Sequence, residues 1–351
     1  MLTDRIEADY LLETPIDPRC AAEIMAGEQS SGTFVAVPGE TPELKERSAA
    51  RVTALDVLDD AVAQRSLPSA GGEREGERIT RAKVTLSWPL ATLGPSLPNL
   101  LATVAGNLFE LKPVSGLRLL DIRMPSAFAE AYPGPLFGHV IEAEADRTGK
   151  KPMFAFNLTG ELDQMRRRHD TLLAHGATCL MASLNSVGLV GMIELRRFSQ
   201  LPIHAHRNGW GYLSRHPLLG WSYVAWQKIW RLAGADHMHV NGLQNKFSET
   251  DESVIEAARA CLTPMFADKP CVVMPVFSSG QSARQIPPTY AALQSPDFIM
   301  TAGGGIMAHP DGPAAGVRSM REAWDAARAG IPLEEHARTH PDLGRALEIA
   351  A

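Results

Sequence analysis

Between residues 139 and 332, short apolar segments typical of β-strands alternate six times with longer segments of helical periodicity. The six expected strands are Pro152–Asn157, Thr178–Leu184, Pro202–His206, His237–Val240, Cys271–Phe277 and Asp297–Ala302. The expected helices are Leu162–His175, Val190–Phe198, Leu218–Leu232, Glu252–Phe266, Pro288–Leu293 and Gly316–Gly330. Such alternation favours a parallel sheet covered by helices, either open and doubly wound or closed as a barrel. A standard (β/α)8 barrel needs eight strand–helix units, so this pattern is two short.

The first third of the chain has a different, mixed pattern. Strand-like segments are Arg5–Glu13, Ser31–Val37, Ile79–Trp88 and Gly116–Arg123, and helix-like segments are Pro18–Glu28, Glu43–Leu58 and Leu97–Asn107. Their order predicts a small α+β domain. We therefore expect an N-terminal α+β domain over residues 1–125, a linker at Pro125–Gly138, a (β/α) barrel domain over residues 139–332 and a helical tail over residues 333–351.

Composition narrows the class of protein. The net charge is −6, from 34 basic and 40 acidic residues, which argues against nucleic acid as a partner. The sequence has no stretch of about 18 uninterrupted apolar residues and no signal-peptide pattern near Met1, so we expect neither a membrane partner nor export. The four cysteines are scattered, which favours reduced thiols in the cytoplasm.

Histidines stand at the ends of two consecutive expected strands. His204 and His206 end one strand, and His237 and His239 end the next. Since strand side chains alternate between faces, each pair shares a face, and parallel strands place both pairs near one mouth. Arg207 follows the first pair directly. These histidines either face a ligand, pack as core residues hydrogen-bonded to the backbone, or hold zinc or iron.

Two glycine-containing loops follow the last two expected strands. Ser278–Gln281 comes after one strand, and Thr301–Gly305 comes after the other. Glycines allow an anion to approach the backbone N–H groups closely, and barrels often bind phosphate after their seventh and eighth strands. Plain turns are the alternative. Lys246 lies in a polar loop after the second histidine pair, where it either stabilises a developing negative charge or is an ordinary surface lysine.

Taken in order, these motifs resemble the large subunit of ribulose-bisphosphate carboxylase, and more closely the RuBisCO-like (form IV) proteins. The resemblance covers nearly the whole chain. It rests on Glu28–Phe34, Gly106–Phe109, Leu117–Pro125, His204–Arg207, Gly234–His239, Lys246, Ser279–Gly280 and Gly303–Gly304. Phe34, the run Val240–Gly242 and Gln281 depart from the usual carboxylase residues and favour the RuBisCO-like group.

The resemblance implies a ferredoxin-like α+β domain, a TIM-type barrel and a homodimer, or a larger assembly of dimers, whose sites use both subunits. It implies Mg²⁺ and proton abstraction beside a carbonyl. RuBisCO-like members carry out enolisation with isomerisation, decarboxylation or transcarboxylation, so we expect a phosphorylated acid sugar as substrate and no photosynthetic CO₂ fixation.

The resemblance also assigns roles to individual residues. His206 and Lys246 are expected at the reacting centre, and Glu28 and Asn107 are expected to come from the partner subunit. The residues expected to bind the substrate's anionic groups are Arg207, His239, Ser279, Gly280, Gly303 and Gly304.

One part of the family pattern is missing. Between Gly138 and Glu142 the family has barrel strands one and two, the second of which ends in the Lys-Asp-Asp-Glu run that holds Mg²⁺. No such cluster follows any later strand, although Mg²⁺ requires oxygen ligands. Three interpretations remain: an enzyme of the RuBisCO-like group, a non-catalytic phosphate-binding or assembly protein without the metal, or a shortened form of a complete enzyme.

Overall fold

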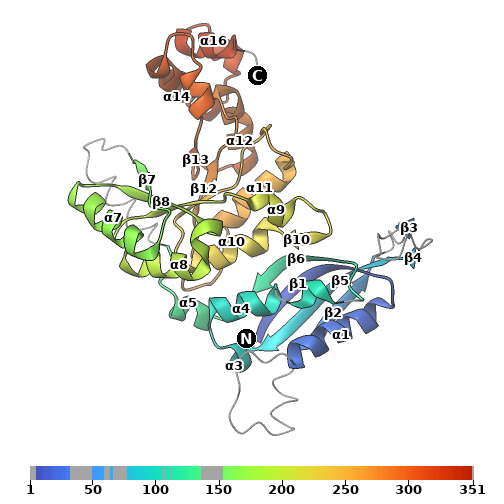
Figure 1. The fold of residues 1–351 in the computed structure, drawn as a ribbon. Helices are drawn as coiled ribbons and strands as arrows, with labels where there is room; N and C mark the ends of the chain where they lie inside the picture. Colours follow the sequence, from blue (N-terminus) through green and yellow to red (C-terminus); the bar gives the residue numbers. More distant parts are fainter. Residues whose placement is uncertain are drawn as a thin grey trace, which may run out of the picture. The chain divides into compact units, whose positions relative to one another are not determined.

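The computed structural model describes residues 5–31, 50–58, 64–65, 77–105, 107–111, 113–135 and 153–349. The chain forms two compact units. Unit 1 contains Met1–Gly134, Val187–Phe198 and Asn208–Gly234, and unit 2 contains Pro135–Ser186, Ser199–Arg207 and Ala235–Ala351. Figure 1 colours the chain from its N-terminus to its C-terminus. The domain boundaries expected at residues 125, 139 and 332 stay a prediction.

Unit 1 is built on a five-stranded sheet in the order β10-β6-β1-β5-β2. The strands are β1 (Arg5–Thr14), β2 (Arg51–Val57), β5 (Thr80–Pro89), β6 (Gly116–Arg123) and β10 (Leu219–Trp221). Alternate side chains of β1, from Ile6 to Leu12, are fully buried, as the period of two requires. The hydroxyl of Tyr10 donates a 2.8 Å hydrogen bond to the carbonyl of Val104, which ties β1 to helix α4 (Leu97–Val104).

The remaining elements of unit 1 are short or helical. They are α1 (Pro18–Ser31), β3 (Gln64–Arg65), β4 (Glu77–Arg78), α3 (Leu90–Leu93), η1 (Asn107–Glu110), α5 (Ala127–Ala131), most of α8 (Leu184–Phe198), α9 (Trp210–Ser214) and α10 (Tyr223–Leu232). The described part of the expected linker therefore contains a helix, α5. Most of the strand expected at Ser31–Val37 lies outside the described residues, and Ser31 itself ends α1.

Two helix predictions are wrong in part. The described end of Glu43–Leu58 forms strand β2, in which Val52 pairs with Leu86 of β5. The start of Leu218–Leu232 forms strand β10, which pairs in parallel with β6, and only then does Ser222 cap α10 by accepting a hydrogen bond from the N–H of Ala225. Pairing partners distant in the sequence decide these segments, because strand propensity depends on context.

Unit 2 contains a six-stranded parallel sheet in the order β13-β12-β11-β9-β8-β7. The strands are β7 (Ala155–Asn157), β8 (Cys179–Ser183), β9 (Ile203–His206), β11 (His237–His239), β12 (Met274–Phe277) and β13 (Ile299–Met300). The six strands predicted from the sequence are confirmed. In Figure 1 they follow one another from green to orange. Within this sheet, each strand pairs with the sheet's next strand along the chain. The sheet therefore has the winding of a TIM-type barrel, and a doubly wound order is ruled out.

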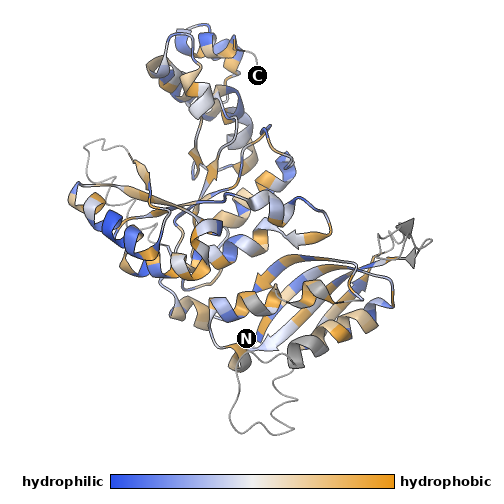
Figure 2. Cartoon of the chain, in the orientation of Figure 1, coloured by the Kyte–Doolittle hydropathy of each residue, from blue (hydrophilic) through white to orange (hydrophobic). Residues whose placement is uncertain are grey.

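Helices follow the strands in sequence. They are α7 (Leu162–Ala174), α8 (Leu184–Phe198), α11 (Asp251–Leu262), α12 (Ile286–Leu293), α13 (Gly303–Met307), α14 (Pro313–Ala329), α15 (Leu333–His336) and α16 (Pro341–Leu347), with a short 3-10 helix, η2 (Ala283–Gln285), before α12. On α7 Met165 and His169 are buried four residues apart, whereas Figure 2 shows hydrophilic residues gathered on the rest of the helix. No helix in the described ranges is both long and apolar enough to cross a bilayer.

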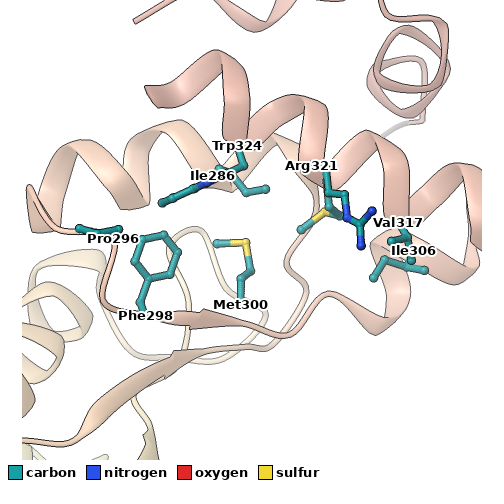
Figure 3. A pocket seen from close by; sticks show the side chains of 9 residues that line it. Ile286, Pro296, Phe298, Met300, Ile306, Val317, Arg321 and Trp324 are labelled. Carbon is teal, nitrogen blue, oxygen red and sulfur yellow. The ribbon is translucent and has the colours of Figure 1, made fainter. Parts of the chain in front are cut away.

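The C-terminal helices form a cluster of their own beside β13. Ala283, Ile286, Ala323 and Leu343 are its buried centre. An apolar cavity of about 290 Å³ adjoins it, lined by side chains from α12, β13, α13 and α14, among them Phe298, Met300 and Trp324 (Figure 3). This cavity differs in chemistry from the polar strand ends, because Arg321 is the one charged residue in its lining.

Candidate functional site

Four imidazoles lie together at β9 and β11 of unit 2. His237 is in register with His204 on the neighbouring strand, so both histidine pairs project from the same face. The ring centroids of His204 and His239 are 4.7 Å apart, and those of His206 and His239 are 4.4 Å apart. His204, His237 and His239 are buried, while His206 is partly exposed. The predicted convergence of the histidines is present.

A chain of hydrogen bonds joins the histidines to the loop after β12. The Nε2 atoms of His204 and His239 are 2.7 Å apart, and Nδ1 of His239 lies 3.2 Å from the hydroxyl of Ser278. Nδ1 of His204 is buried and has no hydrogen-bond partner among the described residues. If His204 donates from Nε2 to His239, and His239 donates from Nδ1 to Ser278, the partnerless atom is an acceptor and no N–H is left unpaired. We assign these neutral tautomers.

Burial keeps these rings uncharged near neutral pH. Desolvation lowers the pKa of His204 to about 3, with repulsion from His237 and His206 as the smaller cause. Burial also lowers the pKa of His239 to about 2 and that of His237 to about 4. Burial and the neighbouring charge of Arg207 lower the pKa of His206. A neutral imidazole donates a hydrogen bond from one ring nitrogen and accepts one at the other, so these rings can orient the groups around them.

Arg207, directly after β9, forms an ion pair with Glu249. The same carboxylate accepts a 3.2 Å hydrogen bond from the side-chain amide of Asn241 and a 3.0 Å hydrogen bond from the hydroxyl of Ser253. Asn241 has a φ of 78°, which turns the backbone sharply at the end of β11. The contacts of Glu249 therefore join the chain after β9 to the loop after β11.

Lys246 is exposed at the tip of that loop. Asn245 closes the loop beneath it, because its amide nitrogen donates to the carbonyls of Gly242 at 2.9 Å and Glu249 at 3.1 Å. A Cβ atom placed on Gly280 would lie 4.0 Å from the Cβ of Lys246. The structure thus brings the predicted lysine beside the predicted glycine loop after β12.

The two glycine loops differ in how closely they are packed. Gly303 and Gly304 begin α13, are exposed and have no atom within 4 Å of a Cβ placed on them. Gly305 is crowded, since a Cβ there would lie 2.7 Å from the carbonyl oxygen of Gln281. Ser279 and Gly280 both adopt positive φ, at 71° and 85°. Open backbone at Gly303 and Gly304 leaves room for a ligand, while Gly305 holds the two loops together.

Eight predicted site residues lie in unit 2, after β9, β11, β12 and β13: His206, Arg207, His239, Lys246, Ser279, Gly280, Gly303 and Gly304. Glu28, in α1, and Asn107, the first residue of η1, belong to unit 1, and their side chains are outside the described set. Sequence reasoning missed Glu249 and Asn245. The polar residues after β11 could have indicated that this loop is functional. They could not have indicated the ion pair, because Arg207, the partner of Glu249, lies 42 residues earlier in the sequence.

The described residues do not fit the Mg²⁺ that the resemblance implies. They contain no group of three or more His, Cys, Asp and Glu side chains arranged to hold a metal ion. Glu249 already accepts hydrogen bonds from Arg207, Asn241 and Ser253, and the other side chains described above at these strand ends are imidazoles, amides, hydroxyls and the ammonium group of Lys246. Mg²⁺ prefers carboxylate oxygens and water. The same result gives no support to zinc or iron at the histidines.

Comparison with known proteins places this architecture in a family. The profile described as ribulose bisphosphate carboxylase large chain, catalytic domain, matches residues 136–350, and the N-terminal domain profile matches residues 10–128. The 3-oxo-isoapionate-4-phosphate transcarboxylase/hydrolase of Xanthobacter autotrophicus is 49% identical, over 99% of this chain and 99% of that protein. The 3-oxo-isoapionate-4-phosphate decarboxylase of Rhizobium rhizogenes is 36% identical, over 97% of each chain.

A solved structure shows the same fold. The rubisco-like protein from Burkholderia fungorum has a TM-score of 0.87 and 39% identity, covering 99% of this chain and 100% of that one. The alignment with the Xanthobacter protein spans 414 positions, more than the 351 residues here, so that relative has residues this chain lacks. This difference agrees with the six parallel strands that the described residues form, where a standard barrel has eight. The chain belongs to the ribulose bisphosphate carboxylase large-chain family, as a RuBisCO-like protein.

Proposed function

We propose that this chain binds a phosphorylated 3-oxo sugar acid at the ends of β9, β11, β12 and β13, and that it removes or transfers the carboxyl group. The observation that carries the proposal is the approach of Lys246 to Gly280, which brings the cationic loop after β11 against the glycine loop after β12. The 49% and 36% identical relatives, both named for 3-oxo-isoapionate 4-phosphate, support the substrate class.

The anionic groups of such a substrate match the residues at the strand ends. Arg207 supplies a guanidinium, which suits the geometry of phosphate and carboxylate oxygens. Ser279 supplies a hydroxyl, and Gly280, Gly303 and Gly304 supply backbone N–H groups without obstructing side chains. We propose that His239, held in one tautomer by its hydrogen bonds to His204 and Ser278, directs the hydroxyl of Ser278 toward the substrate, because both of its ring nitrogens are already engaged.

The chemistry follows from the 3-oxo acid itself. Breaking the bond between the carboxyl group and its neighbouring carbon releases CO₂ and leaves the electron pair as an enolate. The ammonium group of Lys246 stabilises the enolate oxygen. In decarboxylation, water supplies the proton that the enolate carbon takes up, and His206 relays it by accepting that proton at one ring nitrogen and passing a proton on. In transcarboxylation, a nucleophilic acceptor molecule takes up the CO₂. We draw no step through Mg²⁺, because the described residues do not fit it.

The proposal extends to the assembly. We propose a homodimer, or a larger assembly of dimers, in which Glu28 and Asn107 of one subunit complete the site of its partner. The support is the resemblance of Glu28–Phe34 and Gly106–Phe109 to the family segments with that role.

A second function is favoured by one observation. Because the described residues hold no metal-binding cluster, the chain can act as a phosphate-ligand-binding or assembly protein that performs no turnover. Ligand binding would then survive without product formation.

The deciding experiment measures CO₂ release and ligand binding with 3-oxo-isoapionate 4-phosphate. The proposed enzyme consumes the substrate and either releases CO₂ or forms a carboxylated product. Lys246→Met lowers kcat by about a hundredfold or more, and Lys83→Met, which removes the same charge from an exposed position on β5, does not. Binding with neither CO₂ release nor a carboxylated product supports the binding protein. The absence of both binding and release contradicts both functions.

A further inference from the structure

Glu249 lies where three elements of unit 2 meet. It accepts hydrogen bonds from Arg207 after β9, from Asn241 at the end of β11 and from Ser253 on α11. Oε2 takes the arginine and the asparagine, and Oε1 takes the serine. Both carboxylate oxygens are thus engaged within the protein, which suits a carboxylate that orients its neighbours.

The ion pair of Arg207 and Glu249 is largely removed from water. The side chain of Arg207 is 10% exposed and that of Glu249 is 15% exposed. A charged pair at this depth holds its geometry because a rotation of either group leaves a charge poorly solvated. The direction of the Arg207 guanidinium is therefore set by Glu249.

The backbone of Glu249 also closes the loop that carries Lys246. Its carbonyl accepts from the amide of Asn245, whose side-chain oxygen accepts a 2.8 Å hydrogen bond from the N–H of Phe247 and one of 3.1 Å from Asn241. These bonds join the two ends of the loop from Asn241 to Glu249, so the position of Lys246 follows from the same network.

We propose that Glu249 is a positioning residue, whose carboxylate fixes the guanidinium of Arg207 and the shape of the loop from Asn241 to Glu249 so that Arg207 and Lys246 meet one phosphorylated ligand. This inference rests on the proposed function and adds to it the source of the site's preorganisation. Glu249 acts through Arg207 and does not itself touch the ligand.

Three variants test whether Glu249 orients Arg207 or acts in another way. Glu249→Gln keeps an oxygen that can accept from Arg207 and Asn241, and its amide can donate to Ser253, so it preserves the orientation. Glu249→Ala removes every one of these contacts. Glu252→Gln, on the exposed side of α11, loses the same charge without touching the site.

Calorimetric titration with 3-oxo-isoapionate 4-phosphate measures the effect. We expect Glu249→Ala to weaken binding about tenfold or more, Glu249→Gln to stay within about threefold of the wild type, and Glu252→Gln to match it. If Glu249 acted as a general base, both Glu249→Ala and Glu249→Gln would lose kcat, because neither replacement side chain can take up a proton. Equal affinities for the wild type and a folded Glu249→Ala protein would overturn the inference.

A second readout needs no ligand. In arginine side-chain NMR, with Arg207→Lys identifying the signal, we expect slow guanidinium rotation in the wild type and Glu249→Gln, and fast rotation in Glu249→Ala. Unchanged rotation in Glu249→Ala refutes the positioning role. If the wild type shows the expected rotation but binds no phosphorylated acid, the proposed function fails and the orientation of Arg207 by Glu249 stands.

Discussion

The hydrogen bond between His204 and His239 is the residue-scale centre of the site. Period-two alternation predicts that His204 and His206 share a face, and likewise His237 and His239. It does not predict that two Nε2 atoms lie 2.7 Å apart, because that depends on the register of β9 against β11. For the same reason the sequence indicated Arg207 and not its partner Glu249.

The lowered pKa values of these histidines predict how stability depends on pH. Unfolded histidines titrate near 6.5, whereas His204, His237 and His239 stay neutral down to about pH 4. Between pH 6.5 and 4 the unfolded chain therefore binds more protons, so stability falls on acidification, by on the order of 3 kcal/mol per histidine. Urea unfolding across this range should show a shallower pH slope for His204→Gln than for the wild type. Exposed His175→Gln is the control, and an equal slope in all three proteins would contradict the assignment.

At the scale of elements, local sequence patterns predict the parallel strands of unit 2 but not strands β2 and β10 of unit 1. Each strand of unit 2 is a short run, apolar or alternating with histidine, that precedes a helix, a local pattern that the sequence displays directly. The segments at β2 and β10 carry helix-compatible sequences but pair with β5 and β6, and such partners are invisible to local periodicity. Loop packing is equally non-local, as the approach of Lys246 to Gly280, 34 positions further along the sequence, shows.

Gly242 tests this loop packing. A Cβ on Gly242 would lie 2.5 Å from the carbonyl oxygen of Ser278 and 2.2 Å from the side chain of Gln281. We expect Gly242→Ala to destabilise the protein by about 1–3 kcal/mol in thermal unfolding, because backbone must move to admit the methyl group. The matched variant Gly303→Ala meets open space and should keep wild-type stability or gain up to about 1 kcal/mol. Equal stability of the two variants would show that the loops are not packed as described.

At the scale of the whole molecule, the order of the motifs in the sequence was enough to predict the family, although each motif alone is weak evidence for it. The sequence also predicted the six parallel strands that the described residues form, and the 414-position alignment with a relative agrees with this number. What the sequence could not supply is the arrangement of loop side chains, since it depends on contacts between segments more than 20 residues apart.

The missing carboxylate cluster leads to a prediction about metal. If the site binds its ligand through Arg207, Lys246 and backbone N–H groups, removal of Mg²⁺ with EDTA should change the Kd for 3-oxo-isoapionate 4-phosphate by less than about threefold. Titration with and without EDTA measures this. An affinity that drops tenfold in EDTA and returns on adding Mg²⁺ would show that metal ligands outside the described ranges hold the ion.

The central claim is that the ends of neighbouring parallel strands form one site for a phosphorylated acid. A crystal structure of the protein with bound 3-oxo-isoapionate 4-phosphate tests it most directly. The account predicts the phosphate within hydrogen-bonding distance of Arg207 or of the N–H groups of Gly280, Gly303 and Gly304. A ligand bound instead in the apolar cavity beside β13 would contradict it. So would a structure in which Arg207 and Gly304 contact two different ligand molecules.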